Sequence, residues 1–158
     1  AKTFSVCWMN KNIYATKVLR NIRMRNSAGN NNGRIIFNEG LIEWDGDIVL
    51  VEGIIDSIVY PNCIPLMGKQ LYKDSRLYEV LMKKCFGNIY ICLDSDTDIS
   101  ETKRIYRLLN KGALKGRIFY IRMKDFKDFG EVFETLGKEG LVNTIRSAKQ
   151  FSEFELIF

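Results

Sequence analysis

Short apolar runs alternate with longer amphipathic stretches along most of this chain, and this alternation constrains its fold more than any other feature. The short runs have the length and composition of buried β-strands; they lie at 48–51, 63–67, 88–94 and 116–123. The longer stretches have helical periodicity or helix start and stop signals; we expect helices at 54–60, 74–87, 99–111, 130–136 and 139–149. Strands and helices that alternate in this way form βαβ units, which bring parallel strands together. The sequence therefore predicts an α/β fold in which helices flank a four-stranded, mainly parallel sheet.

The first part of the chain has a different composition. Residues 1–38 contain no acidic side chain, and a polar, turn-prone stretch, NSAGNNNG at 26–33, separates most of this segment from the predicted sheet. The basic side chains of the segment are Lys2, Lys11, Lys17, Arg20, Arg23, Arg25 and Arg34. This asymmetry favours a polyanionic partner, and a solvated basic face explains it nearly as well.

The chain contains no histidine, so Ser-His-Asp catalysis, Cys-His catalysis and histidine-ligated metals are excluded. The cysteines show no zinc-binding spacing, and we expect them to be reduced core residues; they are Cys7, Cys63, Cys85 and Cys92. Any catalysis must then use carboxylates, lysines or hydroxyls. No run reaches the roughly 18–20 apolar residues that a membrane span needs, and the N-terminus lacks the apolar region of a signal peptide. We therefore expect a cytoplasmic protein with no membrane partner.

Acidic side chains follow three of the four predicted strands. They are Glu52 after the first strand, Asp94, Asp96 and Asp98 after the third, and Asp125 and Asp128 after the fourth. Because the carboxyl ends of parallel strands share one edge of a sheet, we expect these side chains to lie near one another. Crowded carboxylates repel one another, and oxygen ligands without histidine or thiolate suit Mg²⁺ or Mn²⁺. The alternative is that each strand-end aspartate only caps the helix that follows it.

In this order, the strand-end motifs resemble those of a TOPRIM domain, and the resemblance covers about residues 46–135. The motifs are Glu52 in VLVEGIIDS, Gly68 in PLMGK, the Asp94–Asp96 pair in ICLDSD, and KDFGE at 127–131. The TOPRIM fold is shared by bacterial-type DNA primases, topoisomerases of types IA and II, overcoming-lysogenization-defect nucleases and recombination mediators. The resemblance implies a TOPRIM-like fold with a small basic N-terminal subdomain segment.

Two further features resemble the primase branch, and the wording of the motifs is closest to phage primases. Asp56 matches the EGxxD pattern of that branch, and RMRNSAGNNNGRIIFNEGL is similar to the segment that precedes TOPRIM in primases. The KDFGE element departs from the primase pattern, since Phe129 stands for a proline and Gly130 for an aspartate. Glu39 also stands where a lysine is often found. These departures put one acidic position and one phosphate contact in doubt.

The resemblance implies a DNA primase catalytic core, as a fragment, that synthesises short RNA primers on single-stranded DNA by divalent-metal-dependent nucleotidyl transfer. It divides the chain into a basic segment of the polymerase subdomain (1–45), a TOPRIM domain (46–135) and a C-terminal helical extension (136–158). The implied partners are the single-stranded DNA template, ribonucleoside triphosphates and a replicative helicase, in a bacterial or phage-infected cell. Two alternatives remain open: a TOPRIM-type metal-dependent nuclease and a non-catalytic TOPRIM DNA-binding module.

The resemblance also assigns roles to individual residues. The expected catalytic residues are Glu52, Asp94 and Asp96. The expected ligands of Mg²⁺ or Mn²⁺ are Glu52, Asp94, Asp96, Asp98 and Asp128, with Asp56 as a supporting acidic residue. We expect nucleotide phosphates to contact Lys69, Lys127 and Arg23, and DNA to contact Arg20, Arg25 and Arg34.

Overall fold

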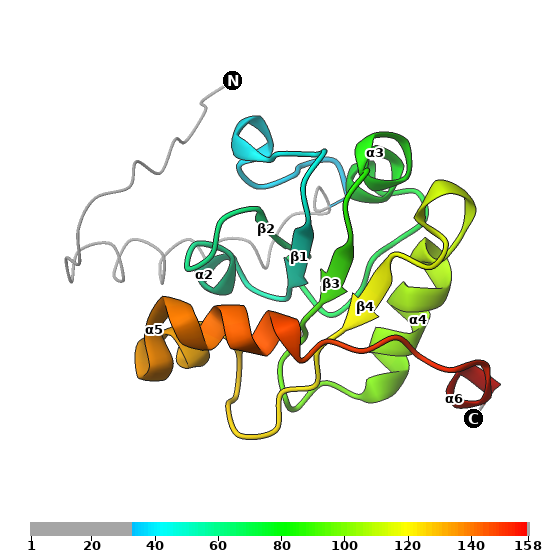
Figure 1. Ribbon diagram of the computed structural model, residues 1–158. Helices are drawn as coiled ribbons and strands as arrows, with labels where there is room; N and C mark the ends of the chain where they lie inside the picture. The colour runs from blue at the N-terminus through cyan, green and yellow to red at the C-terminus, as the bar shows by residue number, and fades with distance from the viewer. Residues whose placement is uncertain (1–32, 158) are drawn as a thin grey trace.

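The computed structural model describes residues 33–157 (Figure 1). The predictions made for Cys7, Arg20, Arg23 and Arg25 therefore concern residues outside the described part of the chain. The described elements, in chain order, are η2 (Glu39–Leu41), β1 (Ile48–Val51), α2 (Ile54–Ser57), β2 (Cys63–Pro65), α3 (Arg76–Lys84), β3 (Ile89–Ile91), α4 (Ile99–Leu109), η3 (Gly112–Leu114), β4 (Ile118–Tyr120), α5 (Phe129–Arg146) and α6 (Glu153–Ile157).

The four strands form one sheet in the order β2-β1-β3-β4, and every neighbouring pair is parallel. Strand β1 is central, since Val49 pairs with Cys63 on one side and with Tyr90 on the other. The predicted α/β fold with a four-stranded parallel sheet is confirmed. The second strand is shorter than predicted because Met67, with φ 61°, leaves the extended conformation just after Pro65.

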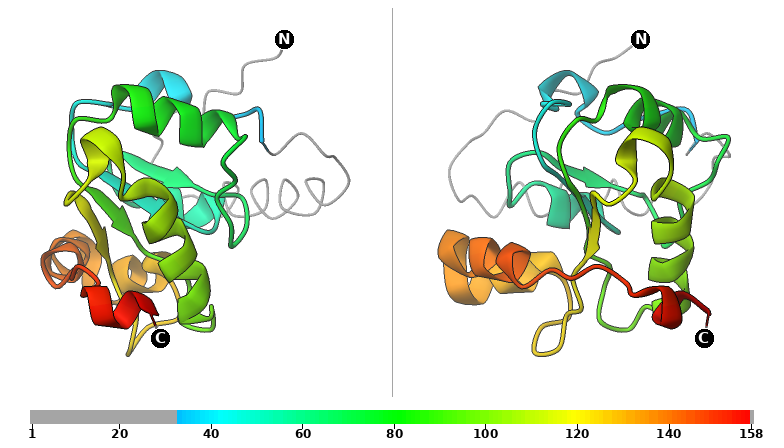
Figure 2. Two further views of the ribbon diagram at one scale, coloured as in Figure 1. Left: turned by 90° about the vertical axis from the view of Figure 1, so that its right-hand side faces the viewer. Right: turned by 45° about the vertical axis from the view of Figure 1, so that its right-hand side comes forward.

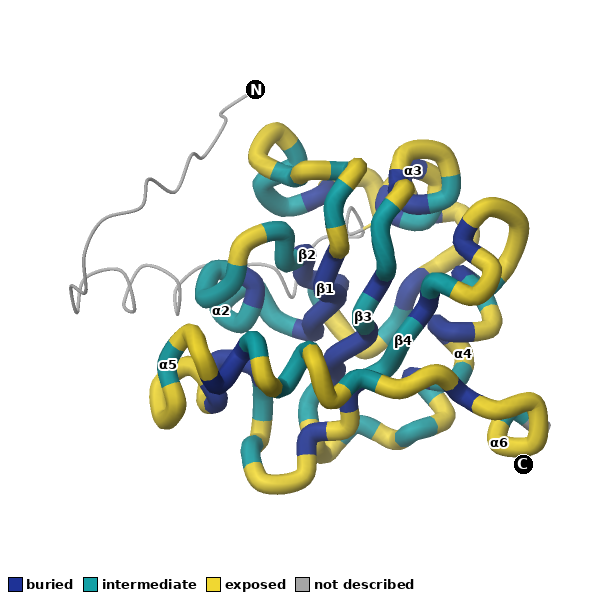
Figure 3. The backbone as a smooth tube through the Cα atoms, viewed as in Figure 1, coloured by how far each residue is buried: buried dark blue, intermediate teal, exposed yellow. Residues whose placement is uncertain are grey.

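Helices cover both faces of the sheet, as the all-apolar strands predict. Successive residues of β1 point to opposite faces: Ile48 and Leu50 belong to an apolar cluster with side chains of α3 and α4, while Val49 and Val51 belong to a second cluster with side chains of α5. Figure 2 shows the sheet between these two helical layers. Figure 3 shows that the buried positions concentrate in the strands and on the sides of the helices that face them.

Helix α5 breaks at Gly137, whose φ of 66° and ψ of −162° are not helical. A residue with positive φ favours glycine, because a Cβ atom would clash with the backbone there. The break confirms the two helical segments predicted on either side of this glycine, and the second segment ends at Arg146. The helix also continues across the predicted boundary between 135 and 136, and the division into three segments stays a prediction.

The segment after α5 packs against the outer strand of the sheet. Lys149 forms an antiparallel bridge with Tyr120 of β4, with backbone hydrogen bonds of 2.7 and 2.9 Å. The ring of Phe151 is buried, stacks on the Tyr120 ring at a centroid distance of 3.8 Å and meets the Tyr106 ring edge-on at 5.1 Å. This segment therefore protects the free edge of β4 from pairing with another chain.

The cysteines of the described part of the chain, Cys63, Cys85 and Cys92, are free thiols. Cys85 and Cys92 are buried, as the sequence predicts, and Cys63 is half-buried. Within residues 33–157, no helix combines the length and the apolar character that crossing a membrane requires.

Candidate active site

Glu52 lies at the carboxyl end of the central strand and is buried, with a relative exposure of 9%. Its Oε1 atom accepts hydrogen bonds from the backbone N–H of Asp94, at 3.1 Å, and from the hydroxyl of Thr97. A buried carboxylate needs such donors, because an unpaired one is costly to remove from water. Glu52 therefore joins the end of β1 to the loop that follows β3.

Asp94 lies directly beyond β3 and is half-buried. Burial, the largest cause, and the negative charges of nearby acidic side chains together raise the pKa of this carboxyl to about 6; in order of effect these side chains are Glu52, Asp56, Asp128 and Asp96. The loops after β1, β3 and β4 thus bring carboxylates close enough to oppose one another's ionisation. The prediction that strand-end acids gather at one edge of the sheet is confirmed for these residues.

Asp56, on the short helix α2, connects two of these loops. Its Oδ1 atom accepts a hydrogen bond from the backbone N–H of Gly130 at 3.2 Å. Burial and the charge of Asp128 raise the pKa of the Asp56 carboxyl. A Cβ atom at Gly130 would lie 2.9 Å from Asp56 Oδ1, and one at Gly53 would lie 2.7 Å from Oδ2. Glycine at position 130, a departure from the primase pattern, therefore leaves room for the Asp56 carboxylate.

Asp98 and Asp128 both cap helices, which was the alternative considered for the strand-end acids. Asp98 accepts a hydrogen bond from the N–H of Ser100 at the start of α4, at 2.7 Å. Hydrogen bonding from Ser100, first from its side chain and then from this N–H, lowers the pKa of Asp98. Asp128 accepts one from the N–H of Glu131 at the start of α5, at 2.8 Å. Of these two capping residues, Asp128 contributes to the raised pKa of Asp94 and Asp98 is not among the causes of it. Metal-binding roles for both residues remain predictions.

Two lysines lie beside the acidic edge. The Nζ atom of Lys69 is 3.6 Å from Asp96 Oδ1, and the Nζ atom of Lys127 is 3.9 Å from Asp128 Oδ2. Both lysine side chains are at least half exposed, so their amino groups are accessible to a ligand. Arg34 is exposed at the start of the described chain.

The donor chemistry of this edge fits a hard divalent cation. All the clustered acidic groups offer carboxylate oxygens, and burial raises the pKa of the nearby Cys92 thiol, so that no thiolate competes with them. Among residues 33–157, no three acidic or cysteine side chains converge on one metal-binding point. Binding by three of them therefore requires side-chain rotation.

Sequence reasoning missed two features of this edge. The first is the Thr97 hydroxyl; a hydroxyl in an acidic loop after a strand is a natural donor to a neighbouring carboxylate. The backbone hydrogen bond from Ser95 N–H to the Lys127 carbonyl, at 2.7 Å, holds the loop after β3 against the loop after β4. A backbone contact of this kind leaves no sequence signal.

A parallel sheet of this order, with these acids beyond its strands, is a TOPRIM-like arrangement. No protein-family model matches the sequence, and no curated protein matches it. Solved structures that match include the zinc-binding and RNA polymerase domains of the Aquifex aeolicus primase, with 23% identity, a TM-score of 0.55 and 67% of this chain covered. The RNA polymerase domain of the Mycobacterium tuberculosis primase DnaG matches with 20% identity, a TM-score of 0.50 and 69% coverage. The same domain, in complex with a double-stranded DNA oligomer with a 6-nucleotide overhang, gives 18% identity and a TM-score of 0.52.

These matches show that the described core has the TOPRIM-like fold found in the RNA polymerase domains of bacterial primases. The likeness is one of fold, since the identities are low. The matched part spans 27% of the Aquifex chain and 38% and 36% of the two Mycobacterium chains.

Proposed function

We propose that this chain forms part of the catalytic core of a DNA primase, which synthesises short RNA primers on single-stranded DNA in the cytoplasm of a bacterial or phage-infected cell. One observation carries the proposal: within a primase-like fold, the loops beyond the parallel strands gather carboxylates around the half-buried Asp94, whose backbone N–H donates to Glu52 at 3.1 Å and whose pKa is raised by burial and then by four neighbouring acidic side chains. Repulsion between clustered carboxylates destabilises a fold, whereas the same cluster favours binding of a cation at a functional site.

In this proposal, Glu52, Asp94 and Asp96 hold Mg²⁺ or Mn²⁺, with Asp128 and Asp98 as further ligands. The metal supplies charge stabilisation for the phosphoryl group under attack and for the leaving pyrophosphate. Glu52 also orients the attacking 3′-hydroxyl or accepts its proton, and the hydrogen bonds from Thr97 and the Asp94 amide fix the position of its carboxylate. Asp56 supports the arrangement by holding the start of α5.

The basic side chains bind phosphates. Lys69 and Lys127 lie at the acidic edge and contact the triphosphate of the ribonucleotide, together with Arg23. Arg34, Arg20 and Arg25 contact the template backbone, in a sequence-independent and salt-sensitive way. A replicative helicase is a further proposed partner.

The test is template-directed incorporation of ribonucleotides by the full chain with Mg²⁺ or Mn²⁺, together with Mn²⁺ binding measured by electron paramagnetic resonance. We compare the wild type with Asp94→Ala/Asp96→Ala and with Glu134→Ala/Glu139→Ala, a control that removes two exposed charges from α5. We expect primer synthesis and Mn²⁺ binding to be lost only in the first variant. Carboxylate-dependent cleavage of the template would support the nuclease alternative, and a wild-type chain that binds no Mn²⁺ would overturn the proposal.

A further inference from the structure

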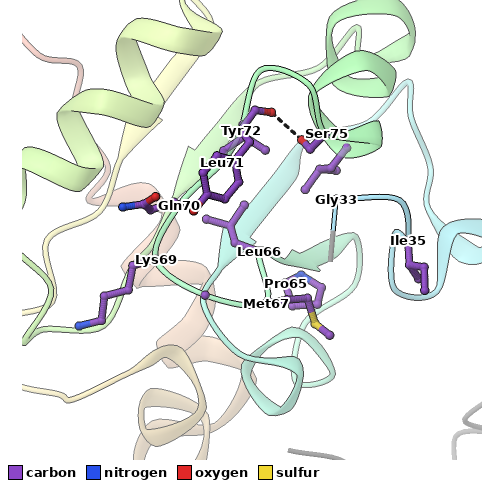
Figure 4. Close-up of a pocket in the computed structure, with 12 residues that line it drawn as sticks. Gly33, Ile35, Pro65, Leu66, Met67, Lys69, Gln70, Leu71, Tyr72 and Ser75 are labelled. Carbon is purple, nitrogen blue, oxygen red and sulfur yellow. Dashed lines mark hydrogen bonds between the residues drawn. The ribbon is translucent and has the colours of Figure 1, made fainter. Parts of the chain in front are cut away.

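A pocket of about 390 Å³ lies beside the carboxyl end of β2, at the free edge of the sheet (Figure 4). Its volume falls within the range of about 300–1,000 Å³ that is typical of small-molecule sites. The walls are mostly apolar, and the residues that matter below are Leu66, Met67, Gly68, Lys69, Gln70 and Tyr72. The proposed function assigns none of the apolar wall.

The pocket adjoins the acidic edge through Lys69. This residue lines the pocket, and its amino group is 3.6 Å from Asp96 Oδ1. In Figure 4 the Lys69 side chain points away from Leu66 and Leu71, out of the pocket. Lys69 therefore connects the pocket to one of the candidate metal-binding carboxylates.

The backbone at this end of the pocket has an unusual conformation. Met67 has φ 61°, a region that non-glycine residues adopt rarely, and Gly68 has φ 155°. A side chain at position 68 would be strained, so the chain passes this point without one. Backbone strain of this kind persists where the surrounding structure holds it, and it recurs at ligand-binding sites.

Two residues that line the pocket, Gln70 and Tyr72, contact charged side chains of the adjoining helix α4. The ring of Tyr72 is half exposed, and the guanidinium of Arg104 lies 5.8 Å from its centroid. Gln70 donates a hydrogen bond of 3.4 Å to Glu101, which is long enough to be exchanged for a ligand. Glu101 has one buried oxygen without a hydrogen-bond donor, 3.7 Å from Arg104. A ligand with a flat ring, polar ring edges and an anionic group matches this set.

We propose that this pocket binds the base of a ribonucleoside triphosphate, stacked on Tyr72, while its phosphates extend past Lys69 to the acidic edge. The inference deepens the proposed function and rests on it, since it supplies the base-binding half of a site whose phosphate half is the primase centre. Gln70, whose amide donates to Glu101, would turn from that contact to hydrogen-bond to the edge of the base.

The experiment compares binding of Mg·ATP, Mg·GTP and Mg·tripolyphosphate to the full chain by calorimetry. Tripolyphosphate reports the phosphate half alone. We expect Tyr72→Ala to weaken nucleotide binding about tenfold, because stacking on an aromatic side chain contributes about that factor, and to leave tripolyphosphate binding unchanged. Tyr72→Phe keeps the ring and should bind nucleotides as the wild type does. Phe86→Ala, which removes a somewhat more exposed ring that does not line the pocket, should change nothing.

The failures of the two proposals are distinguishable. If the wild type binds nucleotides no better than tripolyphosphate, or Tyr72→Ala changes neither, the base pocket is wrong while the phosphate site stands. If Tyr72→Ala weakens binding of a dT20 oligonucleotide but not of nucleotides, the pocket belongs to the template, which also overturns the inference. If neither nucleotides nor tripolyphosphate bind, the proposed function fails with it.

Discussion

The amino group of Lys69 lies 3.6 Å from a carboxylate oxygen of Asp96, so an ion pair joins the loop after β2 to the loop after β3 at the acidic edge. Both side chains are largely exposed, and exposed pairs of this kind contribute about 0–1 kcal/mol to stability. Its importance is therefore electrostatic, because Lys69 partly neutralises a carboxylate that is proposed to bind a metal.

Removal of Lys69 should change metal binding more than stability. We expect Lys69→Met to bind Mn²⁺ about threefold to tenfold more tightly without nucleotide, since one nearby positive charge no longer competes with the ion. Nucleotide binding should weaken, because the proposed contact between Lys69 and the triphosphate is lost. Electron paramagnetic resonance and calorimetry measure the two effects. Lys83→Met, which breaks an exposed pair with Glu79, is the matched control and should alter neither; weaker Mn²⁺ binding by Lys69→Met would contradict the prediction.

The raised pKa of Asp94 predicts a dependence of stability on pH in the metal-free protein. With a pKa of about 6 in the folded state and about 3.9 in the unfolded state, the folded state binds more protons between these values. Stability therefore decreases as the pH rises through this window. Asp94→Asn carries no such charge, and above pH 6 in EDTA it should be more stable than the wild type by about 1 kcal/mol, after discounting for partial exposure.

Urea unfolding at pH 4 and pH 8 measures this difference. Mn²⁺ should stabilise the wild type and not Asp94→Asn, so that with Mn²⁺ the wild type becomes the more stable of the two. Asp98→Asn is the contrasting variant. Hydrogen bonding from Ser100 lowers the pKa of Asp98 in the folded state, so removal of the Asp98 charge should destabilise the protein at pH 8 rather than stabilise it. If the free energy of unfolding depends on pH equally in the wild type and in Asp94→Asn, the pKa of Asp94 is not raised in the folded state.

Thr97 should act as a positioning residue, because its hydroxyl donates a hydrogen bond to Glu52. Thr97→Val keeps the shape and removes the donor, and Thr97→Ser keeps the donor. Partners that orient a metal ligand typically contribute about 10–100-fold to activity, so we expect Thr97→Val to lower kcat for primer synthesis about tenfold with little change in nucleotide KM. Thr97→Ser should restore it. Equal losses in both variants would indicate a packing role instead.

The sequence was sufficient to predict the sheet, because the strands are short, apolar and separated by capped helices. Ile48 and Leu50 are buried on one face of the sheet and Val49 on the other. A strand that is apolar on both faces is typical of a sheet covered by helices on both sides. The gathering of Glu52 and Asp94 at one edge followed from parallel topology alone.

The finer geometry could not be predicted, because it depends on contacts between loops. The pocket beside β2 needs the positive φ of Met67 and the approach of residues 33–35, and neither leaves a pattern in the sequence. The capping roles of Asp98 and Asp128 were visible as an alternative, but a strand-end aspartate has the same spacing whether it caps a helix or faces a metal. Only the hydrogen bonds distinguish the two.

The contact between Gly130 and Asp56 predicts a coupling that a double-mutant cycle measures. Alanine is a better helix former than glycine by about 0.5–1 kcal/mol, and Gly130 lies in the first turn of α5 with helical backbone angles. In the wild type, however, the added Cβ would approach Asp56 Oδ1 to 2.9 Å and displace the carboxylate from the Gly130 N–H. We therefore expect Gly130→Ala to be neutral or destabilising in the wild type and stabilising in an Asp56→Ala background, a coupling of about 1 kcal/mol. Urea unfolding of the four proteins gives the value, and additive effects would show that the start of α5 does not depend on Asp56.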